Sequence, residues 1–132
     1  MVCGGRPHAL GGTFYEPTIL KEVSNDMPIA VNEIFGPVSP LIVFDTEAEA
    51  VQLANDTPYG LASYCYARDI GRIWRVAEGL EYGMVGINEA VLTNASAPFG
   101  GVKQSGLGRE GSRYGLDEYL EIKYLCLGGM QQ

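Results

Sequence analysis

The sequence has few basic residues and almost no histidine. Its 132 residues include nine Lys and Arg against 16 Asp and Glu, for a formal net charge of −7, and a single His. Proteins that bind nucleic acid draw on clustered Lys and Arg, so nucleic acid is not an expected partner. An apolar run long enough to cross a bilayer is also missing, as is a basic and then apolar signal-peptide pattern at the N-terminus. We therefore do not expect a membrane partner either.

Cysteine is sparse, and its pattern argues against a metal site. Cys3, Cys65 and Cys126 lie far apart, and His8 has neither a cysteine nor a second histidine nearby, so zinc ligation is not predicted. An odd, low cysteine count is typical of a reducing compartment, and we expect a cytoplasmic protein. The three thiols are interpreted as buried and inert, and His8 as a solvated loop residue.

What the sequence does contain is an ordinary globular composition with a regular middle part. Hydrophobic residues make up 46% of the chain, and its length suits one domain at most. Residues 13–23 are predicted to be extended, with Pro17 interrupting. Helices are predicted after Thr46, which begins a capping box with Glu49, and after Asp69. Three apolar segments, which precede, separate and follow these two helices, are predicted strands: 40–44, 61–67 and 84–87.

This order predicts an α/β fold in which a β-α-β-α-β unit forms a parallel sheet with helices packed on it. Trp74 falls on the apolar stripe of the second helix and is interpreted as a core residue. The following segment, 88–111, has no periodicity and contains five glycines from Gly100 to Gly111, yet apolar residues are interspersed. We interpret it as an ordered site loop. A short helix over 111–120 and a terminal strand over 120–127 complete the prediction.

A short stretch nearer the N-terminus, Asn32 to Pro37, places a carboxylate and an aromatic ring before a turn. Glu33 and Phe35 are two residues apart and precede Gly36-Pro37, where glycine offers unusual backbone angles and proline fixes its own. A carboxylate held there suits a ligand such as a ribose hydroxyl pair. Taken alone, however, these six residues are better explained by a solvated acid and a core ring, because isolated short motifs are weak evidence.

The segment PFGGVKQSGLGRE at 98–110 changes this interpretation. Together with EIFGP at 33–37, it closely resembles the C-terminal part of the NAD(P)-dependent aldehyde dehydrogenase superfamily. YGMVGIN at 82–88 and YLEIKY at 119–124 look like its succinate-semialdehyde dehydrogenase branch. The resemblance covers essentially the whole chain, and the motifs occur in the family's order.

The resemblance implies a parent enzyme in which a cysteine thiolate attacks the aldehyde, hydride passes to NAD or NADP, and a thioester is hydrolysed. The family's nucleophile and general base lie upstream of the matching segment, and none of the three cysteines matches the nucleophile's motif. We therefore assign no catalytic residue and expect the isolated chain to be inactive. Residues 1–111 would be the end of the catalytic domain, and 112–132 an oligomerisation tail whose strand pairs with a neighbouring subunit to form a homo-oligomer.

The resemblance also implies roles for individual residues. Glu33 would bind the nicotinamide-ribose hydroxyls, Phe35 would lie beside the nicotinamide, and Phe99 would line the pocket near the nucleophile. Thr93 stands where the branch has a serine that helps to hold the far carboxylate of the semialdehyde substrate. It is left open between a substrate contact and an ordinary loop hydroxyl, and it leaves glutarate semialdehyde open as a substrate. Arg109 is interpreted as structural.

Two other functions remain open from the sequence. One is a free-standing α/β module that binds or assembles without catalysis, derived from such an enzyme. The other is an acylating dehydrogenase that uses coenzyme A. The choice between NAD and NADP is also open, because the cofactor-binding domain lies outside the resemblance.

Overall fold

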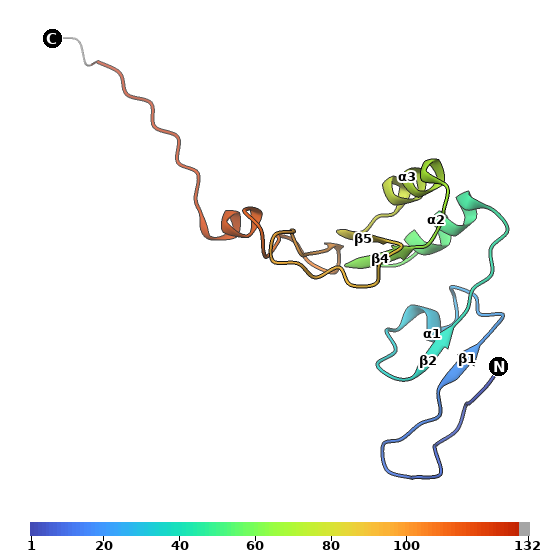
Figure 1. The fold of residues 1–132 in the computed structure, drawn as a ribbon. Coiled ribbons are helices and arrows are strands. Elements are labelled where there is room, and N and C mark those ends of the chain that lie inside the picture. The colour runs from blue at the N-terminus through green and yellow to red at the C-terminus, as the bar shows by residue number, and fades with distance from the viewer. Residues whose placement is uncertain (130–132) are drawn as a thin grey trace. The chain divides into compact units, whose positions relative to one another are not determined.

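The computed structural model describes residues 1–129 and divides into two compact units, which join between Thr57 and Pro58. The first unit contains four elements (Figure 1): β1 (Thr18–Leu20), α1 (Pro28–Val31), β2 (Val38–Pro40) and α2 (Glu47–Asn55). The second contains six: β3 (Tyr59–Gly60), β4 (Ala62–Cys65), α3 (Ile70–Gly79), β5 (Met84–Ile87), β6 (Val102–Lys103) and the 3-10 helix η1 (Tyr114–Tyr119).

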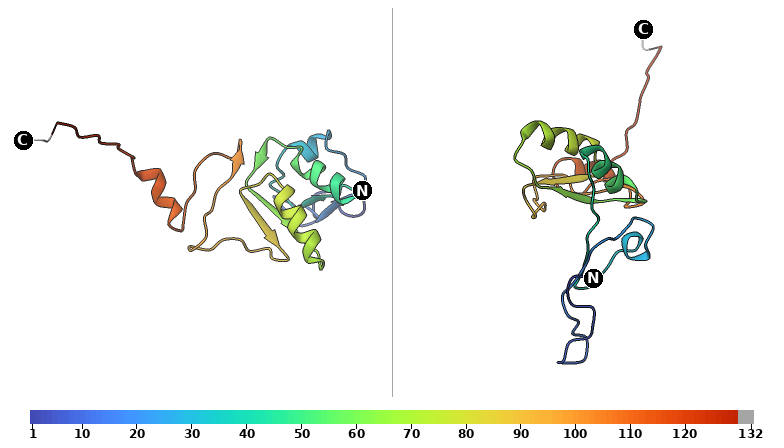
Figure 2. Two further views of the ribbon diagram at one scale, coloured as in Figure 1. Left: turned by 90° about the horizontal axis from the view of Figure 1, so that it is seen from above. Right: turned by 90° about the vertical axis from the view of Figure 1, so that its right-hand side faces the viewer.

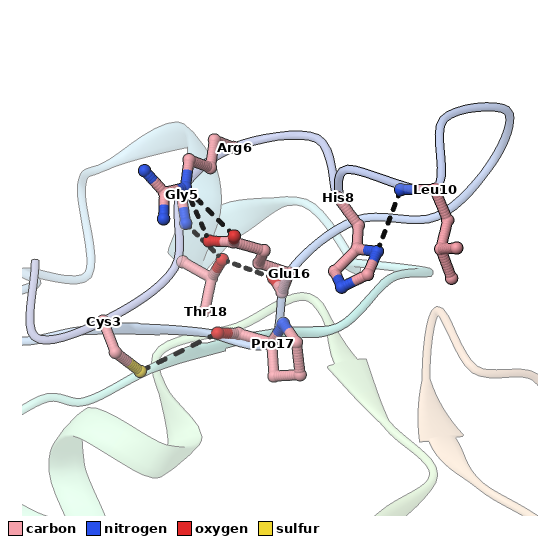
Figure 3. Close-up of polar contacts among 8 residues, drawn as sticks. All are labelled: Cys3, Gly5, Arg6, His8, Leu10, Glu16, Pro17 and Thr18. Carbon is pink, nitrogen blue, oxygen red and sulfur yellow. Dashed lines mark hydrogen bonds and ion pairs between the residues drawn. The ribbon is translucent and has the colours of Figure 1, made fainter.

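The first unit is built on the parallel pair β1–β2, in which Thr18 lies opposite Val38. The N-terminal residues fold back on β1 as a hairpin (Figure 3). Thr18, only 5% exposed, ties the hairpin together, because its hydroxyl accepts a hydrogen bond from the Gly5 N–H and donates one to the Glu16 carbonyl, both at 2.8 Å. The Arg6 guanidinium adds an ion pair with the Glu16 carboxylate at 3.0 Å. Polar contacts, rather than a large apolar core, therefore hold this hairpin.

The second unit is built on the parallel pair β4–β5, with α3 packed against both strands (Figure 2). Ile73, 7% exposed, is the α3 residue buried in this packing. The short strands β3 and β6 form a separate antiparallel pair that anchors the loop following β5. The loop that leaves β5 is therefore held at its far end by this second strand pair.

Both predicted helix caps are confirmed. The Thr46 hydroxyl accepts a hydrogen bond from the Glu49 N–H at 3.1 Å, and the Asp69 carboxylate accepts one from the Arg72 N–H at 2.7 Å. The Glu49 carboxylate accepts from the Asp45 N–H rather than from the cap residue itself. Local capping chemistry thus determines where α2 and α3 begin.

The predicted α/β character and the parallel strand pairs are confirmed, but the strands do not form one sheet in the described residues. They form three two-stranded pairs. The strand predicted for 40–44 is Val38–Pro40, and it takes β1 as its partner. Val43 and Phe44, expected to be buried, are 74% and 56% exposed, because no described strand or helix covers them.

The expected burial of several other side chains is also wrong for this structure. Trp74 is 64% exposed, since α3 packs through the side that carries Ile73 and nothing described covers its other side. Cys3 and Cys126 are exposed and Cys65 is half-buried. His8 is exposed in its loop, as expected.

The C-terminal segment differs from the prediction as well. The helix expected over 111–120 is the shorter η1, and residues 120–127 have no strand partner within the described part of the chain. A strand needs a neighbour to complete its hydrogen bonds, and the described chain offers this segment none. The last three residues of the expected tail, 130–132, lie outside the described residues. Within residues 1–129, no helix is long and apolar enough to cross a membrane.

Candidate functional site

The Glu33–Phe35 segment leaves the end of α1 and enters β2. Asn32 ends the helix, because its backbone N–H and its side-chain amide both donate to the Pro28 carbonyl, at 3.0 and 2.9 Å. On the other side, the Pro37 carbonyl accepts from the Thr18 N–H at 2.8 Å. The segment is therefore fixed at its two ends.

The bend at Gly36-Pro37 does not need glycine's special backbone freedom, which corrects our expectation. Gly36 is not among the residues with positive φ, and a Cβ added to it would meet nothing within 4 Å. The Val38 N–H donates to the Gly36 carbonyl at 2.8 Å across Pro37, so the proline makes the turn.

Glu33 and Phe35 are both exposed, and Phe35 is exposed to 93%. Phe35 is therefore not a core residue of this unit. Among residues 1–129, neither residue forms a hydrogen bond or ion pair. A free carboxylate is acceptor-only and can take two hydroxyl donors at once, and an open aromatic ring can cover a flat group. The two side chains thus fit a ribose diol and an adjoining ring.

The glycine-rich loop of the second unit is ordered, as predicted, and its hydrogen bonds explain why. Phe99 and Glu110 exchange two backbone hydrogen bonds of 2.8 Å, which closes the loop at its base. Inside, the Arg109 guanidinium donates to the carbonyls of Gly101 and Gly108, at 2.7 and 2.6 Å. The structural interpretation of Arg109 is confirmed, because one terminal nitrogen of its guanidinium, Nη1, donates to both loop carbonyls.

An open pocket of about 300 Å³ lies at the base of this loop. The half-buried ring of Phe99 lines it, along with Arg109 and the carboxylate-bearing Glu110 and Glu118. Phe99 therefore borders a cavity, whereas Thr93 is not one of the pocket's lining residues.

Thr93 lies in the segment between β5 and Phe99. It is exposed, and within residues 1–129 its hydroxyl has no hydrogen-bond partner. Two residues of this region were missed by the sequence reasoning. Asn88 has a φ of 53° and bonds to Ala67 through both side-chain polar atoms. An asparagine directly after an apolar strand is a signal that could have found it, since asparagine tolerates left-handed backbone angles.

Glu89 is the second missed residue. Its carboxylate accepts the backbone N–H groups of Ala90 and Val91, at 2.8 and 2.9 Å. These hydrogen bonds favour the charged form and hold the pKa of Glu89 below its usual value.

Two further charged groups lie where the loop meets β6. The Lys103 ammonium is 2.7 Å from a Glu81 carboxylate oxygen. Burial raises the pKa of the neighbouring Tyr82 phenol, and the Lys103 charge opposes part of that shift. No cluster of three or more His, Cys, Asp and Glu that could hold a metal ion occurs in the described part of the chain.

Comparison with protein families matches residues 1–125 to the aldehyde dehydrogenase family. A 3-sulfolactaldehyde dehydrogenase of Pseudomonas putida is 63% identical over 100% of this chain and 27% of its own length. A glutarate-semialdehyde dehydrogenase of Pseudomonas aeruginosa is 62% identical over 98% of this chain and 27% of its own. A mitochondrial succinate-semialdehyde dehydrogenase of Arabidopsis thaliana is 59% identical over 100% and 25%. The chain thus spans about a quarter of the length of these relatives.

Solved structures show the same similarity. A succinate-semialdehyde dehydrogenase from Burkholderia pseudomallei matches with a TM-score of 0.88 and 63% identity, over 96% of this chain and 26% of that one. An NADP-dependent enzyme of E. coli matches with a TM-score of 0.90 and 56% identity over the same shares.

Proposed function

The chain belongs to the aldehyde dehydrogenase family, and from this we propose that it is the C-terminal part of an NAD(P)-dependent semialdehyde dehydrogenase. Residues 1–111 would end the catalytic domain, and 112–132 would form the oligomerisation tail. The observation that carries the proposal is identity of 59–63% across essentially the whole chain with three dehydrogenases of small aldehydes.

The substrate class follows from what those relatives have in common. Sulfolactaldehyde, glutarate semialdehyde and succinate semialdehyde each carry an anionic group away from the aldehyde. We propose that this protein oxidises succinate semialdehyde, or a related aldehyde with an anionic far end, to the carboxylate through a cysteine thioester. The nucleophile and general base would lie upstream of this chain, so the 132 residues alone would not oxidise an aldehyde.

Glu33 and Phe35 would hold the cofactor, NAD or NADP, which when bound supplies the hydride acceptor. The free carboxylate of Glu33 can accept both hydroxyls of a ribose, and hydrogen bonds to a charged acceptor are the stronger kind. The open ring of Phe35 can cover one face of a flat heterocycle. These side chains are exposed and unpartnered in the described chain, which supports the role.

Thr93 and Phe99 would contact the substrate. Phe99 borders a cavity and can exclude water from one side of an aldehyde. The Thr93 hydroxyl has no partner in the described residues and can donate to a carboxylate or sulfonate. A threonine in place of a serine keeps this donor and adds a methyl group.

The fold would be completed by the rest of the polypeptide. Leu41–Phe44 is apolar and mostly exposed, as expected of a strand edge that further strands or helices cover in a whole catalytic domain. Residues 120–127 expose large apolar side chains, among them Ile122, and can add as a strand to a neighbouring subunit. We also propose a cytoplasmic location. The alternative of a free-standing binding module is not favoured, because the named relatives are dehydrogenases.

The test is an assay of the complete gene product that contains these residues. Succinate semialdehyde, glutarate semialdehyde and an uncharged aldehyde, butanal, would be offered with NAD and with NADP, and formation of the reduced cofactor followed. We expect kcat/KM for the anionic aldehydes to exceed that for butanal by about tenfold or more, the value of one hydrogen bond to a charged group. No oxidation of any semialdehyde, or a preference for butanal, would contradict the proposal.

A further inference from the structure

A side chain extends the β4–β5 pair beyond its last backbone residue. Cys65 and Ile87 are the final register partners, and the Asn88 N–H still donates to the Cys65 carbonyl at 2.9 Å. The Asn88 amide then takes over: its Oδ1 accepts the Ala67 N–H at 2.9 Å, and its Nδ2 donates to the Ala67 carbonyl at 2.8 Å. One side chain thus satisfies both backbone polar groups of Ala67, as a neighbouring strand would.

The backbone of Asn88 meanwhile turns away from the sheet. Its φ of 53° lies in the left-handed region, which asparagine enters more readily than most residues. Glycine would allow the same backbone angle but has no side-chain amide, and the aspartate carboxylate offers an acceptor but no donor. The two hydrogen bonds and the turn together therefore suit asparagine, and they fix the direction in which the chain leaves β5.

The residues that follow are held by further side-chain bonds. The Glu89 carboxylate accepts the next two backbone N–H groups at 2.8 and 2.9 Å, and the Asn94 amide oxygen accepts the Ser96 N–H at 2.8 Å. Thr93 lies between these two closed turns. These hydrogen-bonded turns limit its position relative to Asn88, and the side chain of the adjoining Leu92 lies close to Gly86 in β5.

We propose that Asn88 is a positioning residue for the substrate, because it sets the place of the Thr93 hydroxyl without touching the substrate itself. The inference rests on the proposed function, in which Thr93 contacts the anionic end of the aldehyde. In α/β proteins, ligands bind beyond the carboxyl ends of the parallel strands, which is where Asn88 lies. The Thr93 hydroxyl has no hydrogen-bond partner in the described residues, so it is available to bind a substrate.

The kinetic test uses Asn88→Gly in the complete gene product, because glycine keeps the backbone angle and removes both side-chain bonds. Asn25→Gly is the matched control: Asn25 also bridges distant backbone, donating to the Leu53 carbonyl at 2.9 Å, but it lies in the other unit. For Asn88→Gly we expect KM for succinate semialdehyde to rise about tenfold, with kcat and the KM for butanal nearly unchanged. Asn25→Gly should leave all three unchanged.

A double mutant sharpens the test. If Asn88 acts through Thr93, Asn88→Gly should add little to the KM effect of Thr93→Val, because both remove the same contact. Asn88→Asp, which keeps the acceptor for the Ala67 N–H, should restore part of the loss. Additive effects of the two substitutions, or equal KM increases for succinate semialdehyde and butanal, would overturn the proposal.

Hydrogen–deuterium exchange separates this inference from the proposed function. Exchange in the peptide covering 89–97 should become faster in Asn88→Gly and stay unchanged in Asn25→Gly. If the wild-type protein oxidises no semialdehyde, the proposed function fails and takes the substrate part of the inference with it, and this measurement alone decides whether Asn88 fixes the segment that carries Thr93. Unchanged exchange in 89–97 would then overturn it.

Discussion

The two segments that carry the proposed site residues are held in different ways. Around Thr93 and Phe99, backbone hydrogen bonds close several turns of the loop, and side-chain amides, carboxylates and the Arg109 guanidinium add further bonds to its backbone. In the segment with Glu33 and Phe35, hydrogen bonds occur only at the two ends, and the two side chains between them are free in the described residues. The first segment determines its own shape, while the second presents exposed groups.

The loop is therefore preorganised by its own hydrogen bonds, whereas the segment of Glu33 and Phe35 offers free groups that can recognise a ligand. A substrate loop gains from rigidity, because fixed donors need not be ordered when the substrate arrives. In a segment with a free carboxylate and an exposed ring, these side chains form their interactions only when a ligand binds. The comparison therefore predicts that substitutions at Arg109, which holds the loop without a proposed substrate contact, act mainly on stability, whereas substitutions at Glu33 act mainly on binding.

The largest expected effect comes from adding one methyl group beside the loop. A Cβ on Gly83 would collide with the backbone of Gly100 and lie 2.8 Å from the Gly101 Cα. We expect Gly83→Ala to lower the free energy of unfolding by about 3 kcal/mol, since backbone cannot move aside cheaply. Gly36→Ala, with open space around it, should change stability by less than about 1 kcal/mol. Urea unfolding of both variants measures the difference, and similar midpoints would contradict it.

The Arg109 guanidinium gives the next effect. Arg109→Met removes the Nη1 group that bonds two loop carbonyls, and leaving partly buried carbonyls unpaired should cost about 1–3 kcal/mol. Arg113→Met is the control, because Arg113 is exposed and the polar and ring contacts of its side chain within residues 1–129 are to the neighbouring Tyr114 alone. Its cost should stay below about 1 kcal/mol. Thermal melts compare the two, and an equal loss would show that Arg109 does not hold the loop.

Glu33 should show the opposite behaviour, with binding affected and stability retained. In the complete gene product, Glu33→Gln should weaken cofactor binding about tenfold, because a charged acceptor for two hydroxyls is replaced by a neutral one. Its unfolding midpoint should be unchanged. Glu22→Gln, which removes an exposed carboxylate whose ion-pair partner in the described part of the chain is Lys21 alone, should alter neither quantity. Titration calorimetry with NAD and NADP measures the affinity, and equal affinities in wild type and Glu33→Gln would remove Glu33 from the site.

The smallest effect is a titration. The pKa of Glu89 is lowered in the folded chain by two backbone hydrogen bonds, so these bonds contribute fully above the unfolded pKa and are lost as pH falls through the folded pKa. The amide proton shifts of Ala90 and Val91 should therefore titrate with a midpoint below that of an ordinary glutamate. Glu89→Gln should abolish this titration. A midpoint at or above the usual value would show that the carboxylate does not cap the turn in solution.

Sequence reasoning predicted what depends on local chemistry. The caps at Thr46 and Asp69 and the strands near 62–65 and 84–87 followed from short patterns that a few neighbouring residues complete. The pairing of β1 with β2 could not be predicted in this way, because it joins segments about 20 residues apart by backbone bonds alone. Likewise, the exposure of Trp74 depends on what packs over α3, which a helical stripe does not state.

For the site, the resemblance supplied candidates and the structure supplied their surroundings. Glu33 and Thr93 came from matching motifs, since an isolated acid or hydroxyl carries little signal. The two hydrogen bonds between the Asn88 side chain and the backbone of Ala67 were not predicted, because Ala67 lies 21 residues earlier in the chain.

The most direct test of the contrast between the two segments is hydrogen–deuterium exchange of the complete gene product, with and without NADP or NAD. The account predicts that the peptide spanning 32–37 gains protection when cofactor is added, while the peptide spanning 98–110 is already protected and changes little. Cofactor-dependent protection of the glycine-rich loop, with none at 32–37, would contradict the assignment of recognition to Glu33 and Phe35 and of preorganisation to the loop.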